Sequence, residues 1–204
     1  YYIFNSMQGI FMDSGYNIED VKQIEILSSA VRGEILDIIE FFGKLSIREI
    51  SEHTGRSQHS LYHHIKMLHE VELIYESETR KVNGQIESIY DVPGRPMRLK
   101  YDSEDTSVTS KILSIIRGIV STNMRDFQRA FDNFLIHRHK NLHNVTHTRE
   151  IGWLSDEEVY EFQMKMRRLL LEFKVRDKPV CEAKRKLYTL SVLLVPKKQS
   201  KIEA

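Results

Sequence analysis

Polar side chains that can donate and accept hydrogen bonds gather on one face of a predicted helix in the first third of the chain. Leu61, Ile65 and Leu68 follow the spacing of a buried helical stripe. At about 100° per residue, the opposite face carries His59, Tyr62, His63 and Lys66. Such groups can reach base edges in a DNA groove, where carboxylates would be repelled by phosphate. The pattern favours a nucleic-acid reader, although an amphipathic helix with a solvated polar face shows the same periodicity.

The second group of side chains suited to chemistry is a run of four histidines, His137, His139, His143 and His147. The last three have the i, i+4, i+8 spacing that would align them on a helix, and imidazole binds Zn²⁺ and Ni²⁺. No cysteine or acid completes the set within the run, and Asn144 indicates that a helix has already ended. We therefore predict no metal and no cofactor, with a sensing role for these histidines as the alternative.

The single cysteine, Cys181, excludes an intramolecular disulfide and fits a reducing cytoplasm. Lys184 and Arg185 lie nearby and would lower its thiol pKa, so redox sensing is the alternative to an inert thiol. The chain has no Gly-rich phosphate loop, no Gly-x-Ser-x-Gly elbow and no Cys-x-x-Cys pair. No apolar run reaches the roughly 18–20 residues that cross a bilayer. We expect a cytoplasmic protein that is not an enzyme and does not contact a membrane.

Local signals between residues 46 and 68 mark the elements that must position the reader helix. Ser46 and Glu49 have the spacing of a capping box that begins a short helix. Gly55 suits a tight turn because glycine tolerates positive φ, and Ser57 can cap the following helix. Two short helices joined by a short turn that contains glycine are typical of a helix-turn-helix.

A β-hairpin is predicted directly after these helices, over residues 73–92. Asn83 and Gly84 lie between two β-compatible runs, which is typical of a two-residue hairpin turn. Arg80, Lys81 and Asn83 lie at or near the tip, where basic side chains contact phosphates and set the register on DNA. An ordinary solvated turn is the alternative. Residues 44–100 contain nine Lys or Arg and eight Asp or Glu, so DNA binding would depend on where these charges lie.

The predicted fold class is mainly α with a small β-hairpin. We expect a short helix that is capped by Asn17 and reaches Leu27, and a second helix over residues 29–42. Pro93 and Pro96 then interrupt the chain. The predicted organisation is a winged helix-turn-helix domain at residues 17–102, a C-terminal helical dimerisation region at 103–196, and flexible termini at 1–16 and 197–204.

Residues 104–139 form one long helical pattern with an apolar stripe. The residues expected to form a dimer seam along it are Ile112, Ile115, Ile119, Phe127, Phe131 and Phe134. The stripe is longer than a winged helix can cover, so a second copy of the chain would bury it. Packing against a second helix, predicted at residues 155–173 from a capping box at Ser155 and Glu158, is the intrachain alternative. A strand is expected at residues 186–195, and a small-molecule effector of unknown identity is left open.

Several segments of the first half together resemble a known family of regulators. They are residues 29–36 for an opening helix, Glu49-Ile50, Thr54-Gly55, Ser57 and residues 60–68 for the reader, residues 72–74 for the wing entry, and Gly94-Arg95-Pro96 with Tyr101 for its exit. In this pattern residues 25–102 resemble the ArsR-type winged-helix regulators. The resemblance implies a winged-helix fold, homodimerisation and repressor-like operator binding.

Two further observations qualify the resemblance to the ArsR type. The metal-sensing branch of that family carries a cysteine motif in the first helix of the helix-turn-helix. Residues 47–53 contain no cysteine, so thiolate metal sensing there is excluded. Trp153-Leu154-Ser155 and residues 186–196 weakly resemble C-terminal extensions behind some ArsR-type domains, which implies no defined ligand.

These patterns predict a sequence-specific DNA-binding transcription regulator that acts as a homodimeric repressor on a pseudo-palindromic operator. The residues expected to contact DNA are Ser57, Gln58, His59, Ser60, Tyr62, His63, Lys66, Arg80, Lys81 and Asn83. The expected partners are double-stranded DNA and a second copy of the chain. A winged-helix module that binds protein instead of DNA is the alternative from another class, and the near-neutral net charge of +1 favours it.

Overall fold

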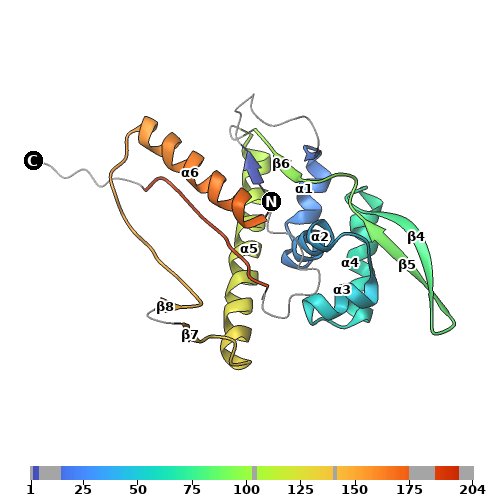
Figure 1. Cartoon of the computed structure of the whole chain (residues 1–204). Helices are drawn as coiled ribbons and strands as arrows, with labels where there is room; N and C mark the ends of the chain where they lie inside the picture. The colour runs from blue at the N-terminus through green and yellow to red at the C-terminus, as the bar shows by residue number, and fades with distance from the viewer. Residues whose placement is uncertain (1, 5–14, 103–104, 140–141, 175–186, 198–204) are drawn as a thin grey trace, which may run out of the picture. The chain divides into compact units, whose positions relative to one another are not determined.

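The computed structural model describes residues 2–4, 15–102, 105–139, 142–174 and 187–197 (Figure 1). The chain divides into two compact units, Tyr1–Arg129 and Ala130–Ala204, and each is described by itself. This division lies further along the chain than the 102/103 boundary expected from the prolines. The reason is that the helix which follows the prolines packs onto the first unit.

The first helices of the first unit begin and end at residues suited to caps. α1 (Val21–Leu27) begins after Asp20, whose carboxylate accepts hydrogen bonds from the backbone N–H groups of Lys22 and Gln23 at 2.6 and 3.2 Å. The expected cap, Asn17, instead lies in strand β2 (Tyr16–Ile18), where buried Ile18 sets the strand against the core. α2 (Ala30–Phe42) ends at Gly43, whose φ of 90° favours glycine.

The two helices of the helix-turn-helix begin at the predicted residues. In front of α3 (Ile47–Thr54), the Ser46 hydroxyl accepts from the Glu49 N–H at 3.3 Å, and the Glu49 carboxylate accepts from the Ser46 N–H at 2.7 Å. The capping box is therefore confirmed. α4 (Gln58–Glu70) begins after Ser57, whose hydroxyl accepts from the Ser60 N–H at 3.3 Å.

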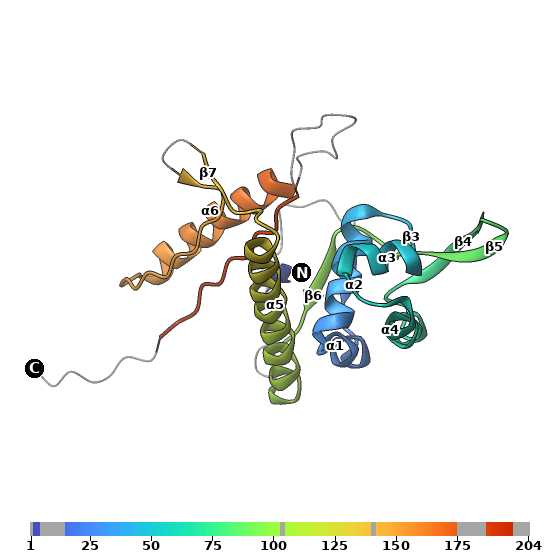
Figure 2. The same ribbon diagram turned by 90° about the horizontal axis from the view of Figure 1, so that it is seen from below.

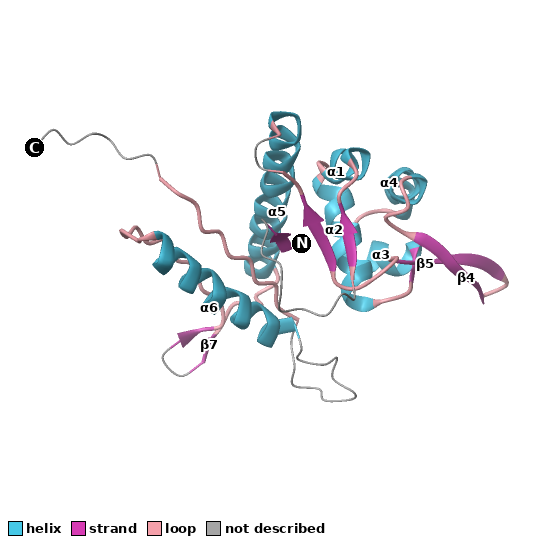
Figure 3. Cartoon of the chain, turned by 90° about the horizontal axis from the view of Figure 1, so that it is seen from above, coloured by secondary structure: helices cyan, strands magenta, loops and turns pink. Residues whose placement is uncertain are grey.

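A small antiparallel sheet with a long hairpin lies beside these helices, as Figure 3 shows. Its order is β3 (Leu45–Ser46), β5 (Gln85–Asp91), β4 (Tyr75–Val82). Val82 pairs with Gln85 across a two-residue turn, in which Asn83 and Gly84 have φ values of 49° and 84°. The predicted hairpin and its turn are confirmed, and with the preceding helices they make a winged helix-turn-helix.

The second sheet was not predicted. Its middle strand, β6 (Met97–Lys100), pairs in parallel with β1 (Tyr2–Phe4) on one side and with β2 on the other. Met97 and Leu99 are fully buried, so β6 closes the core between the wing and the next helix.

The long helix α5 (Thr106–Asp132) lies beside α1 and α2 (Figure 2). Val108, Ile112 and Ile115 are buried in the same core cluster as Ile35 and Leu36 of α2. A side chain at Gly118 would meet Ala30 Cα at 3.1 Å, which shows how closely α5 approaches the start of α2.

The N-terminal part of the apolar stripe of α5 is therefore covered by its own chain, whereas Phe131, further along the stripe, is 55% exposed. Ile112 and Ile115 are 4% and 3% exposed, and Ile119 packs against the core. The helix ends at Asp132 instead of residue 139, so Phe134 lies outside it with φ of 54° and a side chain that is 93% exposed. Phe134 therefore does not share the helix face of the other five predicted seam residues, and the dimer seam itself stays a prediction.

The second unit contains a short hairpin and one further long helix among its described residues. β7 (Arg138–His139) pairs with β8 (Leu142–His143) in the segment expected to be helical. α6 (Asp156–Lys174) begins with the predicted capping box, because Ser155 and Glu158 exchange hydrogen bonds at 2.8 and 3.3 Å.

Two expectations for the C-terminal half concern strands and membrane spans. Residues 187–195 form no strand with any described segment, so the predicted strand is wrong for the single chain, since an apolar strand needs a hydrogen-bonding neighbour. Within the described ranges, no helix has the length and apolar character that a bilayer span requires.

Candidate nucleic-acid interface

The turn between α3 and α4 is fixed by hydrogen bonds from both sides. Gly55 has φ of 65°, in the left-handed region, and its N–H donates to Ser51 O at 2.9 Å. The Thr54 hydroxyl donates to Ile50 O at 2.9 Å and accepts from the Arg56 N–H at 3.3 Å. The Ser51 hydroxyl donates to Arg56 O at 2.5 Å. The direction in which α4 leaves the turn is thereby set by residues 51–57.

The two faces of α4 separate as the sequence predicted. Leu61, Ile65 and Leu68 are buried. The predicted reader residues on this helix and its cap are all exposed: Ser57, Gln58, His59, Ser60, Tyr62, His63 and Lys66. Glu70 lies 3.8 Å from the Lys66 ammonium, but both side chains are more than half exposed, so this pair is weak and leaves Lys66 available.

His64 lies between the two faces of α4 and was not singled out from the sequence. It is half-buried, and its Nδ1 is buried without a hydrogen-bond partner among the described residues. Burial, and then the charges of Arg32, His63 and Arg56, lower its pKa from the ordinary value of 6.5. His64 is therefore neutral near pH 7 and belongs to the packed side of the helix.

The wing is tied to α3 by ion pairs that the sequence did not reveal. The Arg80 guanidinium lies 3.2 Å from the carboxylate of Glu49, and Arg48 lies 3.1 Å from the carboxylate of Glu87. Burial opposes ionisation of Glu49, but the hydrogen bonds from Ser46 and the charge of Arg80 outweigh it and lower the pKa of Glu49. Lys81 points to the other side of the strand, is exposed, and makes no ion pair with the described residues.

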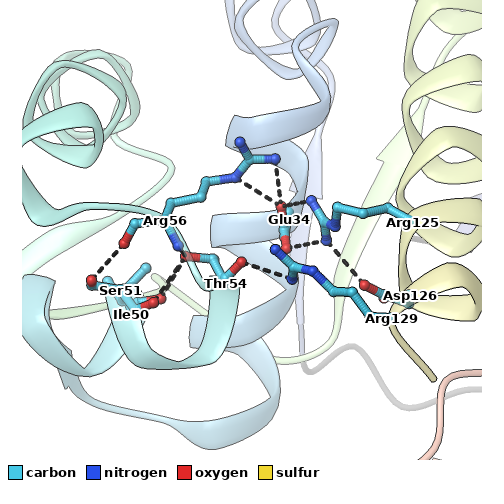
Figure 4. Close-up of polar contacts among 8 residues, drawn as sticks. All are labelled: Glu34, Ile50, Ser51, Thr54, Arg56, Arg125, Asp126 and Arg129. Carbon is cyan, nitrogen blue, oxygen red and sulfur yellow. Dashed lines mark hydrogen bonds and ion pairs between the residues drawn. The ribbon is translucent and has the colours of Figure 1, made fainter. Parts of the chain in front are cut away.

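A buried carboxylate connects α2, the turn and α5, as Figure 4 shows. Glu34 is 8% exposed and accepts from the guanidinium groups of Arg56 at 3.3 Å and Arg125 at 2.9 Å. The carboxylate of Glu34 raises the pKa of Arg125. Arg129 donates to the backbone carbonyl of Thr54 at 3.0 Å. These contacts join residues up to 91 positions apart, so no local sequence signal could have paired them.

The other candidate sites do not assemble in the described parts of the chain. His139 and His143 lie on opposite strands of the β7–β8 hairpin instead of one helical face, and no group of three or more His, Cys, Asp or Glu side chains is placed to hold a metal there. Trp153 is 81% exposed. Cys181 lies outside the described residues.

Comparison with known proteins agrees with this geometry for one segment. The family model described as "Bacterial regulatory protein, arsR family" matches residues 29–76, from the cap of α2 through α3 and α4 to the start of β4. No curated protein matches the chain significantly. The matched family is one of transcription regulators and not of enzymes, as the sequence predicted. The protein therefore carries at residues 29–76 a helix-turn-helix domain of the arsR family, which identifies it as a DNA-binding transcription regulator.

Proposed function

We propose that the protein is a sequence-specific repressor that binds a pseudo-palindromic operator as a homodimer. The observation that carries the proposal is the exposed polar face of α4, which a well-fixed turn presents away from the core. A reader helix needs both features, because base edges are recognised by hydrogen bonds whose geometry must be held. The repressor role extends the arsR family match and requires an operator that overlaps a promoter.

The first nine residues of α4, Gln58 to Lys66, include the proposed base contacts. Gln58 and His59 stand at the N-terminal end, where recognition helices enter the major groove. Glutamine can pair with adenine through two hydrogen bonds, and lysine can donate to guanine O6 and N7. We therefore assign base reading to Gln58, His59, His63 and Lys66. Ser57, Ser60 and Tyr62 lie on the same face and are proposed to contact phosphate or sugar.

The wing residues divide into two roles in this proposal. Lys81 is exposed at the hairpin and is proposed to contact phosphate together with Asn83. Arg80 is engaged with Glu49, so its role is to hold the wing against α3. The wing thus contributes one cation per protomer to phosphate contact, not the two expected from the sequence.

The proposed dimer surface is the exposed side of α5, which lies beside the buried part of the predicted stripe and includes its exposed residue Phe131. Leu113, Val120 and Met124 are 48%, 50% and 65% exposed there, and a shallow hollow is lined by Ile116, Arg117, Val120, Ser121 and Met124. Exposed apolar side chains at helical spacing are typical of an interface between copies. Two copies would place two α4 helices on successive major grooves, about one helical turn apart.

A module that binds protein instead of DNA is the competing function, and the charges favour it. Four cations of this domain each pair with a carboxylate of the same domain: Lys44, Arg48, Arg80 and Arg95. This pairing reduces the positive electrostatic potential that would attract DNA phosphates. Gel shifts with fragmented genomic DNA and excess polyanion competitor separate the two functions. We expect a discrete set of retained fragments that share an inverted repeat. If the competitor removes all DNA equally, the protein-binding module is the better account.

The expected place of action is the cytoplasm, where the operator DNA would lie. A small-molecule effector is not part of the proposal.

A further inference from the structure

The C-terminal half of α5 is bound to the turn of the helix-turn-helix by two arginines. Arg129 donates to the carbonyl of Thr54, the last residue of α3, at 3.0 Å. Arg125 donates to Glu34 at 2.9 Å, and Glu34 also accepts from Arg56 at 3.3 Å. Both residues of the turn that flank Gly55 are thus held from α5, one directly and one through a shared carboxylate (Figure 4).

The fit at Gly55 shows how closely this contact is made. A Cβ atom at Gly55 would lie 3.1 Å from Arg129 Nη2 and 3.4 Å from its Cζ. The guanidinium group therefore lies against the one residue of the turn that lacks a side chain and adopts a left-handed conformation. Glycine at this position has the greatest backbone freedom, so an external contact is effective in restraining it.

We infer that Arg125 and Arg129 are positioning residues for DNA reading, which fix the direction of α4 by restraining residues 54–56. This inference rests on the proposed function of α4. Ser57 caps α4 directly after Arg56, so a shift of the turn moves the first reader residues with it. A displacement of about 1 Å at base edges is enough to weaken hydrogen bonds that need donor–acceptor distances near 3 Å.

A direct phosphate contact by the same arginines is the simplest competing explanation. The structure disfavours it, because Arg125 is 26% exposed in its side chain and its guanidinium group is engaged with Glu34 and Asp126. The two explanations differ in a measurable way. A lost phosphate contact weakens binding to all DNA and lowers the salt slope, which is the steepness with which log affinity falls as log salt concentration rises. A misaligned reader helix instead weakens operator binding selectively.

The test compares Arg129→Ala, Arg125→Ala and the charge-retaining Arg129→Lys with the full-length wild-type protein. Arg168→Ala is the matched control, because it removes one exposed arginine of α6 that makes no hydrogen bond or ion pair with the described residues. Affinity is measured for the operator and for a scrambled duplex over a range of salt. Amide hydrogen exchange is followed at Gly55 and Arg56, whose N–H groups are hydrogen-bonded in the turn.

We expect both alanine variants to lose about tenfold in operator affinity, since misaligned contacts act like one mismatched base pair or more. Scrambled-duplex affinity and the salt slope should stay as in the wild type. Exchange at Gly55 and Arg56 should quicken by about tenfold as the turn opens more often. Arg129→Lys should show the same selective loss, because its ammonium keeps the charge without the guanidinium fork. Arg168→Ala should change none of these values.

Two outcomes would overturn the inference. The first is an equal loss for both duplexes with a reduced salt slope, which would make the arginines phosphate contacts. The second is unchanged amide exchange at Gly55 and Arg56 in the variants. A wild-type protein with no operator preference would refute the proposed function instead, and amide exchange would still decide whether α5 restrains the turn.

Discussion

Adjacent cations on the wing, Arg80 and Lys81, should affect DNA binding in different ways. Arg80 is paired with Glu49 at 3.2 Å, whereas Lys81 is exposed and forms no ion pair within the described chain. Each phosphate contact contributes about 0.9 to the salt slope, which corresponds to roughly fivefold in affinity between about 1 M and 0.15 M salt. Lys81→Ala should therefore lower the slope of a dimer by about two and its affinity by on the order of 30-fold at 0.15 M.

Arg80→Ala is the matched control, since it removes the same charge one residue away. Its pair with Glu49 is 45% and 25% exposed, so its loss should cost less than about 1 kcal/mol of stability. The salt slope should remain close to that of the wild type. Fluorescence anisotropy with labelled operator between about 0.05 and 0.3 M KCl gives both slopes. A larger drop in slope for Arg80→Ala than for Lys81→Ala would refute the assignment of the two roles.

Three further predictions concern packing, pH and assembly. Gly118→Val should lower the free energy of unfolding by about 1–3 kcal/mol, since its side chain would overlap Ala30; unchanged thermal melting would show that α5 does not pack there. Burial lowers the pKa of His64 in the folded protein, so the unfolded chain binds a proton before the folded protein does as the pH falls. The stability contributed by neutral His64 should therefore be complete above about pH 6.5 and be lost as the pH falls toward the folded pKa. His64→Leu should reduce this fall in urea titrations at pH 7.5 and 5.5, and an identical pH dependence would contradict the effect of burial. Val120→Asp should convert a dimer to a monomer in light scattering without lowering the melting temperature, and a dimer that tolerates it places the interface elsewhere.

The parts of the fold that the sequence predicted correctly depend on neighbouring residues. The capping boxes at Ser46 and Ser155, the cap at Ser57 and the turn at Asn83-Gly84 each involve residues within three positions of one another. Such signals keep their meaning in any tertiary context because the hydrogen bonds close locally. The two faces of α4 were predictable for the same reason, since helical periodicity assigns them.

The incorrect expectations depended on contacts between distant segments. An apolar stripe indicates that Ile112 and Ile115 are buried, but not whether α2 or a second chain covers them. Asn17 does not cap a helix, because residues Tyr16–Ile18 pair as a strand with β6, which lies about 80 positions away in the sequence. Apolar periodicity also led us to predict a helix that extends beyond Asp132, although the chain turns there and continues into a hairpin. Glu34 and Arg125 were missed because a single charged residue in a helix does not specify its partner.

The most direct test of the central claim is a competition titration of operator against a scrambled duplex of the same length. It is carried out for the wild type and for the double variant His63→Ala/Lys66→Ala, whose substitutions lie on the exposed face of α4. The account predicts that the wild type prefers operator by about a thousandfold or more at physiological salt. The double variant should keep the wild-type melting temperature and lose at least about tenfold of that preference. Equal preference in both proteins would contradict the claim that α4 reads the sequence.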